Sequence, residues 1–156
     1  MTPHFQPPRW FMLANRMVAP LVRWGLPVGG RQAPMALLTV VGRRSGQLRT
    51  TPIALARHDR GWILIAVYGE TDWSRNLEAA GEGSITLRGA VIEVKARRLE
   101  PEQAAPILED AMRGAPAVVI RMTAPYFDAP VDSANVNWTL EASRHPVFLL
   151  EPLEGA

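Results

Sequence analysis

Residues 42–52 hold the side chains of this chain that are best suited to bind an anion. The segment reads Gly-Arg-Arg-Ser-Gly-Gln-Leu-Arg-Thr-Thr-Pro and lies between two apolar runs, 35–41 and 52–56. Glycine lets backbone N–H groups approach a ligand, and the arginine guanidinium matches phosphate and carboxylate oxygens. A solvated hairpin loop can have the same composition. Because of its glycines and arginines, we interpret the loop as a site for a polyanionic cofactor. It is not a P-loop, because it lacks the Lys-Ser/Thr ending.

A second segment, residues 66–77, joins a buried strand to a helix and reads Ala-Val-Tyr-Gly-Glu-Thr-Asp-Trp-Ser-Arg-Asn-Leu. Free N–H groups at a helix start suit an anion or a heteroaromatic carbonyl. Gly69 would let a planar ring lie on the backbone. Trp73 and Leu77 are four residues apart, so we favour core packing for these two side chains. Asn76 is the favoured polar anchor for a ligand.

Other residue types give little evidence for a catalytic group. The chain has no cysteine, which excludes disulfides and thiolate sites, and it has no spaced set of His, Asp and Glu, so we expect no metal. We interpret His4, His58 and His145 as surface histidines, because they fall in a tail, a turn and a strand start. The formal net charge is only +2, and we therefore expect no nucleic acid as a partner.

The elements that must position these residues are mostly strands. At 156 residues the chain is long enough for a single domain with a real core, residues 1–156. A proline-containing flexible lead is expected over 1–8, and an amphipathic helix over 9–25, interrupted or kinked at Pro20. Apolar runs and turn signals predict six strands and three further helices. The strands are 35–42, 51–57, 62–68, 84–88, 90–99 and 145–151, and the helices are 73–80, 101–112 and 115–122.

The order of these elements predicts the fold class. The strands are mostly neighbours in sequence, which favours a mainly β, antiparallel barrel or half-barrel with helical additions over residues 35–151. Asp72 is the expected N-cap of the helix over 73–80. Pro146 predicts that the last strand starts at an edge of the sheet, because proline cannot donate to a neighbouring strand.

The N-terminal helix has two possible roles. Arg9, Arg16 and Arg23 recur every seven residues and form one basic stripe, and apolar side chains cover much of the rest. Such a helix could make peripheral contact with an anionic membrane through residues 9–25. We favour a cap that covers the barrel and the cofactor site, because Pro20 and the short length weaken membrane affinity. No apolar run approaches the ~20 residues of a spanning helix and no secretory signal is recognised, so we expect a cytoplasmic protein, with membrane association left open.

Taken together, residues 37–52, 65–69 and 72–81 resemble the deazaflavin-dependent nitroreductase family. These are split β-barrel proteins related to flavin-binding pyridoxamine-phosphate-oxidase-like domains. The resemblance covers roughly residues 9–99 and returns weakly at 144–150. It implies an antiparallel split β-barrel that binds the deazaflavin coenzyme F420.

The resemblance also implies which residues bind the coenzyme. The arginine-containing loop would hold the phosphate and the acidic tail, the end of the strand would lie along the deazaflavin ring, and the following helix would add two residues. The implied coenzyme-binding residues are Arg43, Arg44, Ser45, Gly46, Arg49, Thr51, Pro52, Ala66, Val67, Tyr68, Gly69, Trp73 and Asn76. Relatives that reduce nitroaromatics use tyrosines near the C-terminal helix, and Tyr126 is the candidate here.

The resulting prediction is an enzyme in which reduced F420 passes a hydride to a small organic substrate of the quinone, nitroaromatic or enone type. The protein would supply position, electrostatics and the exclusion of water. Two alternatives stay open: an oxidoreductase that binds FMN, and a non-catalytic split-barrel protein that carries a cofactor or lipid. Monomer and homodimer also stay open, because barrel edges can be covered by helices or by a second chain.

Overall fold

The computed structural model describes residues 9–24 and 34–154, so the expected lead over residues 1–8 lies outside the described residues. The helices are α1 (Arg9–Arg23), α2 (Asp72–Ala80), α3 (Pro101–Arg113), α4 (Ala117–Thr123), α5 (Trp138–Arg144) and the 3-10 helix η1 (Ala124–Tyr126). The strands are β1 (Met35–Val41), β2 (Leu48–Ala54), β3 (Ala56–His58), β4 (Gly61–Ile65), β5 (Glu82–Leu87), β6 (Ala90–Arg98) and β7 (Val147–Pro152).

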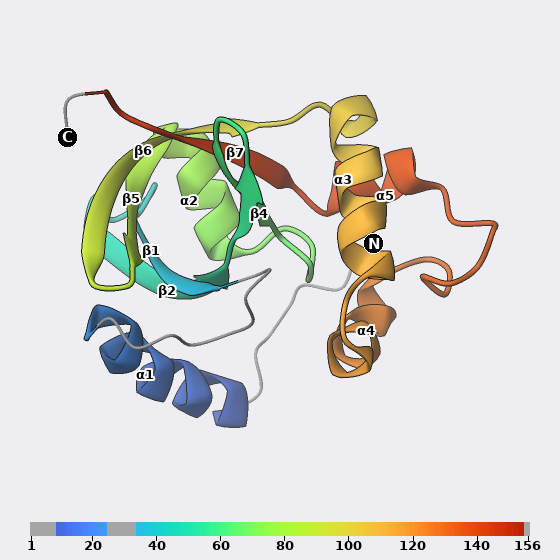
Figure 1. Ribbon diagram of the computed structural model, residues 1–156, viewed down its shortest axis with the longest axis horizontal. Helices are drawn as coiled ribbons and strands as arrows, with labels where there is room; N and C mark the ends of the chain where they lie inside the picture. Colours follow the sequence, from blue (N-terminus) through green and yellow to red (C-terminus); the bar gives the residue numbers. More distant parts are fainter. Residues whose placement is uncertain (1–8, 25–33, 155–156) are drawn as a thin grey trace.

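The seven strands form one antiparallel sheet in the order β2-β1-β5-β6-β7-β4-β3. The sheet curls around α2, and β2 at one edge contacts β4 near the other edge (Figure 1). Helices α3, α4 and α5 gather beside one end of this curl, and α1 runs along the outside of β1 and β2. The mainly β, antiparallel half-barrel with helical additions is therefore confirmed.

The sheet has seven strands and not six, because the expected strand over residues 51–57 is divided in two. Leu55 separates β2 from β3, which lie at opposite edges of the sheet. Its side chain is fully buried, and its N–H donates to the carbonyl of Pro34 at 3.0 Å. The bend is held by burial and by this one hydrogen bond, and no glycine or proline marks it in the sequence.

Strands β4 and β7 are shared by two hydrophobic clusters. Leu64 and Phe148 face the inside of the curl, where the other strands and α2 complete the inner cluster. Ile63 and Leu149 alternate with them and face the outer cluster, to which α3 and α5 contribute. Burial of one such side chain contributes about 2 kcal/mol, so both faces of these strands are strongly specified.

The prediction that the last strand starts at an edge is wrong. Strand β7 lies between β6 and β4 and is buried on both faces. Pro146 lies immediately before the strand, and its carbonyl accepts a hydrogen bond from the N–H of Ala66 at 2.9 Å. Its missing N–H therefore costs the strand no ladder hydrogen bond.

Helix α1 packs on the outside of the barrel. It contacts β1, β2 and β5, and Val22 on this side is 1% exposed. The helix continues through Pro20 without the expected interruption. Across residues 9–24 and 34–154, the structure contains no helix with the length and apolarity needed to cross a membrane.

Candidate functional site

The loop between β1 and β2 is closed by its own backbone. The Gly42 N–H donates to the Gln47 carbonyl at 2.8 Å, and the Gly46 N–H donates to the Gly42 carbonyl at 2.9 Å. The Ser45 hydroxyl oxygen accepts from the Gln47 N–H at 3.2 Å. Gly46 has φ +67°, with open space around the position of a missing Cβ. Glycine is thus required here for the backbone conformation.

Arg44 of this loop and Arg49, which follows the loop as the second residue of β2, face solvent. The side chains of Arg44 and Arg49 are exposed, and neither makes a hydrogen bond or an ion pair to the part of the chain that the structure describes. Thr51 and Pro52 follow on β2 and are half-buried. The loop therefore presents two guanidinium groups whose hydrogen-bond donors are available to an anion.

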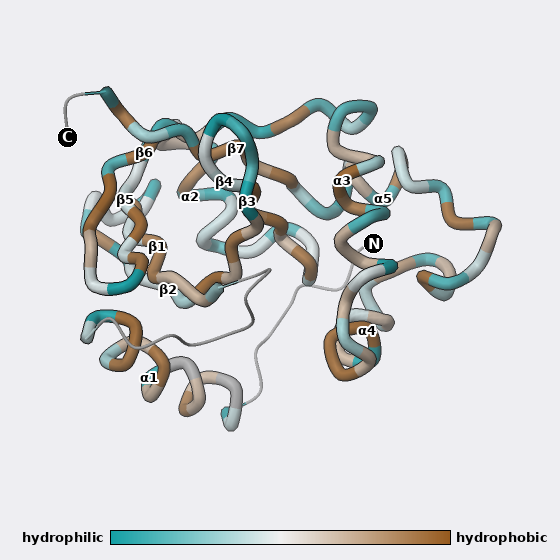
Figure 2. The backbone as a smooth tube through the Cα atoms, in the orientation of Figure 1, coloured by the Kyte–Doolittle hydropathy of each residue, from teal (hydrophilic) through white to brown (hydrophobic). Residues whose placement is uncertain are grey.

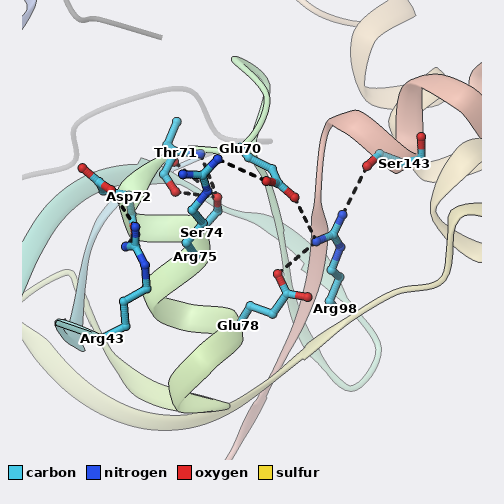
Figure 3. Close-up of polar contacts among 9 residues, drawn as sticks. All are labelled: Arg43, Glu70, Thr71, Asp72, Ser74, Arg75, Glu78, Arg98 and Ser143. Carbon is cyan, nitrogen blue, oxygen red and sulfur yellow. Dashed lines mark hydrogen bonds and ion pairs between the residues drawn. The ribbon is translucent and has the colours of Figure 1, made fainter. Parts of the chain in front are cut away.

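Arg43, by contrast, joins the loop to the start of α2. Its Nη1 donates to Asn76 Oδ1 at 2.7 Å and its backbone N–H donates to the same oxygen at 3.1 Å. Its Nη2 lies 3.1 Å from Asp72 Oδ1 (Figure 3). Asn76 is buried, and its carbonyl oxygen is thus used within the protein. These bonds bring together the two segments that the sequence singled out.

The start of α2 is capped by Thr71 and not by Asp72, which corrects the sequence prediction. The Thr71 N–H donates to Ser74 Oγ at 2.9 Å, and the Ser74 hydroxyl donates to the Thr71 carbonyl at 2.9 Å. Asp72 is the first residue of the helix, and its carboxylate pairs with Arg43. Thr71 and Ser74, three residues later, form a capping box in which each side chain pairs with the backbone of the other residue.

A second group of ion pairs surrounds the same helix start. Arg98 on β6 reaches Glu70 at 3.3 Å and Glu78 at 2.9 Å, and it donates to the Ser143 carbonyl at 3.2 Å (Figure 3). Arg75 also pairs with Glu70, at 3.5 Å. These bonds connect α2, β6 and α5 around the segment that precedes the helix.

Trp73 and Leu77 anchor α2 in the barrel. The Trp73 ring lies 6.2 Å from that of Phe148 and packs against the inner cluster. Leu77 is fully buried. The packing role that the four-residue spacing predicted for both side chains is confirmed.

Residues 66–69 form a turn that follows β4. The strand ends at Ile65, three residues earlier than expected. Ala66 is buried, and its carbonyl accepts from the Gly69 N–H at 2.9 Å. Gly69 has φ +83°, and a Cβ there would lie 3.4 Å from the Arg144 carbonyl. The turn thus requires glycine at its last position, and Val67 and Tyr68 between these ends are half-buried.

Tyr126 lies against this turn. Its ring and that of Tyr68 form a T-shaped contact, with centroids 5.6 Å apart and planes at 84°. Burial raises the pKa of Tyr68, and the neighbouring Tyr126 raises it further. The structure therefore brings the candidate for substrate contact next to the segment that was predicted to line the ring.

The prediction of surface histidines holds for His58, which is exposed, and is wrong for His145. His145 is 1% exposed, and its ring stacks on that of Phe127 at 4.1 Å. Burial lowers the pKa of His145, although the carbonyls of Tyr126 and Ala66 and the carboxylate of Glu141 act in the opposite direction. Glu141 is 2% exposed and lies four residues earlier, a helical spacing that was visible in the sequence. His4 lies outside the described residues.

A pocket of about 490 Å³ adjoins η1. It opens between the end of α3, α4 and the loop after η1, and its lining includes Arg113, Ile120, Phe127 and Val131. This lining is mostly apolar, with Arg113 and Asp132 as its charged members. No group of three or more His, Asp or Glu side chains suited to hold a metal ion occurs in the residues that the structure describes.

Comparisons with known proteins identify a family and a shared fold. The model of a family described as F420H(2)-dependent quinone reductase matches residues 17–124, more than half of the chain. No curated protein matches the chain.

Several solved structures share the fold. A protein described as an F420-H2 dependent reductase (FDR-A) superposes with a TM-score of 0.52 at 22% identity, over 78% of this chain and 95% of its own. A domain-swapped dimer gives 0.54 at 20% identity, over 87% of this chain and 95% of its own. A protein of unknown function from Agrobacterium tumefaciens gives 0.53 at 18% identity, over 98% of this chain and 59% of its own. At these identities the likeness shows the fold alone.

Proposed function

The chain belongs to the F420H(2)-dependent quinone reductase family and is thus a deazaflavin-dependent oxidoreductase; on that premise we propose that Arg44 and Arg49 bind the acidic tail of F420 and that the acceptor is a quinone-type molecule. The observation that carries the proposal is the contrast among the loop arginines. Arg43 is bonded within the protein, whereas Arg44 and Arg49 are exposed and without a polar partner in the described residues.

The donor set of the loop fits the coenzyme. Phosphate and carboxylate oxygens accept hydrogen bonds, and the loop offers two guanidinium groups, the Ser45 hydroxyl and open space at Gly46. A hydrogen bond to a charged group contributes about 1.5–3 kcal/mol, so two such arginines would give much of a micromolar affinity. Thr51 and Pro52 follow the loop on β2 and would lie beside the ring or the linker.

The turn over 66–69 would lie along the deazaflavin ring, through Ala66, Val67, Tyr68 and Gly69. When bound, reduced F420 supplies a hydride. The contribution of the chain is position: Arg43 and Asn76 hold the loop against α2, and Trp73 fixes that helix in the core. Tyr126 and the mostly apolar pocket beside η1 would face the acceptor and limit the access of water.

The test is the oxidation of reduced F420 by a soluble quinone such as menadione, followed by the return of the absorbance of oxidised F420. We expect turnover with F420 and none with reduced FMN. Turnover with FMN alone would favour the flavin alternative. Tight binding of F420 without turnover of quinones, nitroaromatics or enones would favour a non-catalytic carrier.

A specific observation also favours a membrane surface as a partner of α1. The side chains of one face, spaced three and four residues apart, are all exposed: Trp10, Leu13, Met17, Leu21 and Trp24. Figure 2 shows hydrophobic positions recurring along this helix, and Arg9, Arg16 and Arg23 are exposed as well. The helix contains no acidic residue. A basic, apolar face of this kind suits the interface of an anionic bilayer.

Liposome sedimentation tests this second proposal. Wild-type protein should sediment with vesicles that contain phosphatidylglycerol and stay in solution with neutral vesicles. Replacement of Leu13 and Met17 by Ser should release it, whereas replacement of the exposed Val118 of α4 by Ser should not. Equal sedimentation of the two variants would reject α1 as the membrane contact.

A further inference from the structure

One buried imidazole contacts two segments that are far apart in the sequence. His145 Nδ1 lies 3.3 Å from the Ala66 carbonyl oxygen, and its Nε2 lies 3.0 Å from the Tyr126 carbonyl oxygen. Ala66 begins the turn that follows β4, and Tyr126 ends η1. The imidazole therefore connects the candidate ring-binding turn with the segment that carries the candidate acceptor tyrosine.

Glu141 and Phe127 fix the orientation of this imidazole. Glu141 Oε2 lies 3.4 Å from His145 Nε2 and has no hydrogen-bond partner of its own, while Oε1 accepts from the Asp128 N–H at 2.9 Å. The Phe127 ring is stacked on the imidazole with only 10° between the planes. Three oxygens thus surround the two ring nitrogens, so an N–H on either nitrogen has an acceptor, and a rotated ring would lose these contacts.

The two segments joined by His145 carry the two tyrosines of the chain. Tyr68 lies two residues after Ala66, and Tyr126 is itself the residue whose carbonyl faces the imidazole. Their rings form the T-shaped contact at 5.6 Å. The relative position of the two rings therefore depends on the backbone of both segments, and His145 contacts both.

We propose that His145, backed by Glu141, is a positioning residue that fixes the Tyr68–Tyr126 pair beside the coenzyme ring and so controls the use of the acceptor. The effect of His145 on the acceptor rests on the proposed function. Its effect on the position of the two tyrosine rings can be tested without the coenzyme. Arg44 lies on the β1–β2 loop and Arg49 near the start of β2, and the ring nitrogens of His145 contact neither element, so the affinity for F420 should depend little on His145.

The structural half is tested by NMR at neutral pH on protein with labelled tyrosine. Because the chain has only two tyrosines, a cross-peak between their rings reports this contact directly. We expect the cross-peak in wild-type protein, its loss in His145→Phe, which keeps the stack on Phe127 but removes both polar contacts, and partial retention in His145→Gln. Leu108→Ala, a fully buried change on α3, is the matched control for lost stability and should keep the cross-peak.

The functional half is tested by the kinetics of the same variants. In His145→Phe, kcat/KM for the quinone should fall roughly tenfold to a hundredfold, the scale expected for a misplaced contact. The dissociation constant for F420 should stay within about twofold, and His145→Gln should recover part of the rate. If His145→Phe does not fold, the same measurements on His145→Gln and Leu108→Ala test the proposal. His145→Gln should then show the lower kcat/KM and the weaker cross-peak.

Three results would overturn the proposal. The cross-peak could persist in a folded His145 variant, it could be lost equally in Leu108→Ala, or it could be lost with no change in kcat/KM. Absence of turnover in the wild-type protein, with the expected NMR pattern, would contradict the proposed function and leave the positioning role of His145 standing.

Discussion

The β1–β2 loop and the junction around His145 use polar side chains in opposite ways. In the loop, Arg44 and Arg49 are exposed and have no polar partner in the described residues. At the junction, His145 and Glu141 are almost completely buried and face each other and three backbone groups. The exposed guanidinium groups of the loop are the proposed ligand contacts, whereas the buried polar side chains at the junction hold segments of the site in place.

The largest effect should follow from removing the exposed charge of the loop. Arg44→Gln with Arg49→Gln should weaken F420 binding by about a hundredfold, since each lost charge-assisted contact costs about 1.5 kcal/mol or more. Stability should change by no more than about 0.5 kcal/mol. Fluorescence titration and urea unfolding measure the two quantities.

The matched control removes two exposed arginines elsewhere, by Arg57→Gln and Arg88→Gln. It lowers the net charge by the same amount and should leave F420 affinity nearly unchanged. An equal loss of affinity in both double variants would mean that the net charge of the protein, and not the loop, attracts the coenzyme.

The next largest effect concerns the buried His145 and the pH dependence of the free energy of unfolding. Because burial lowers the pKa of His145, the unfolded chain takes up a proton near pH 6.5 while the folded chain does not. The free energy of unfolding should therefore fall as the pH falls below about 6.5, by at most about 1.4 kcal/mol per pH unit. Urea unfolding at pH 7.0 and 5.5 measures it.

In this pH window His145→Gln should show a flatter dependence than the wild-type protein. His58→Gln is the control, because His58 is exposed and its replacement should keep the wild-type slope. A steeper loss in His145→Gln, or the same slope in all three proteins, would argue against a buried neutral imidazole at neutral pH.

Replacement of Arg43 should have a smaller effect, on both stability and F420 binding. Arg43 belongs to the loop, but its side chain is hydrogen-bonded within the protein, as the side chains at the junction are. Arg43→Gln removes the bonds to Asn76 and Asp72 and should lower the free energy of unfolding by about 1–2 kcal/mol. F420 binding should weaken less than in the double variant of Arg44 and Arg49. Equal stability of Arg43→Gln and wild type would show that the loop is held by its own hydrogen bonds.

The smallest effect concerns Asp72, the exposed partner of Arg43 in the ion pair. The Asp72 side chain is 80% exposed, so Asp72→Asn should lower the free energy of unfolding by less than about 1 kcal/mol. Added salt should reduce even this difference. A loss as large as that of Arg43→Gln would place the energy of the contact in the ion pair and not in the bonds to Asn76.

Local patterns predicted most of the strands and the helices α1 to α4, because alternation, apolar runs and turn residues are read within a few residues. The short helices η1 and α5 were not predicted. They did not reveal the bend at Leu55 or the central place of β7, since both depend on which strands meet when the sheet curls. The position of His145 shows the same limit, because it was expected at the surface and lies buried between segments remote in sequence. The hydrogen bonds that Asn76 accepts from Arg43 also join remote segments, and its contact with a ligand stays a prediction.

The most direct measurement compares the affinity of wild-type protein for F420 and for the same deazaflavin without its phosphate and acidic tail. If Arg44 and Arg49 bind the tail, wild type should prefer F420 by about a hundredfold, and the Arg44→Gln, Arg49→Gln variant should bind both compounds almost equally. A wild-type protein that binds both compounds equally, or a double variant that keeps the full preference, would contradict the account.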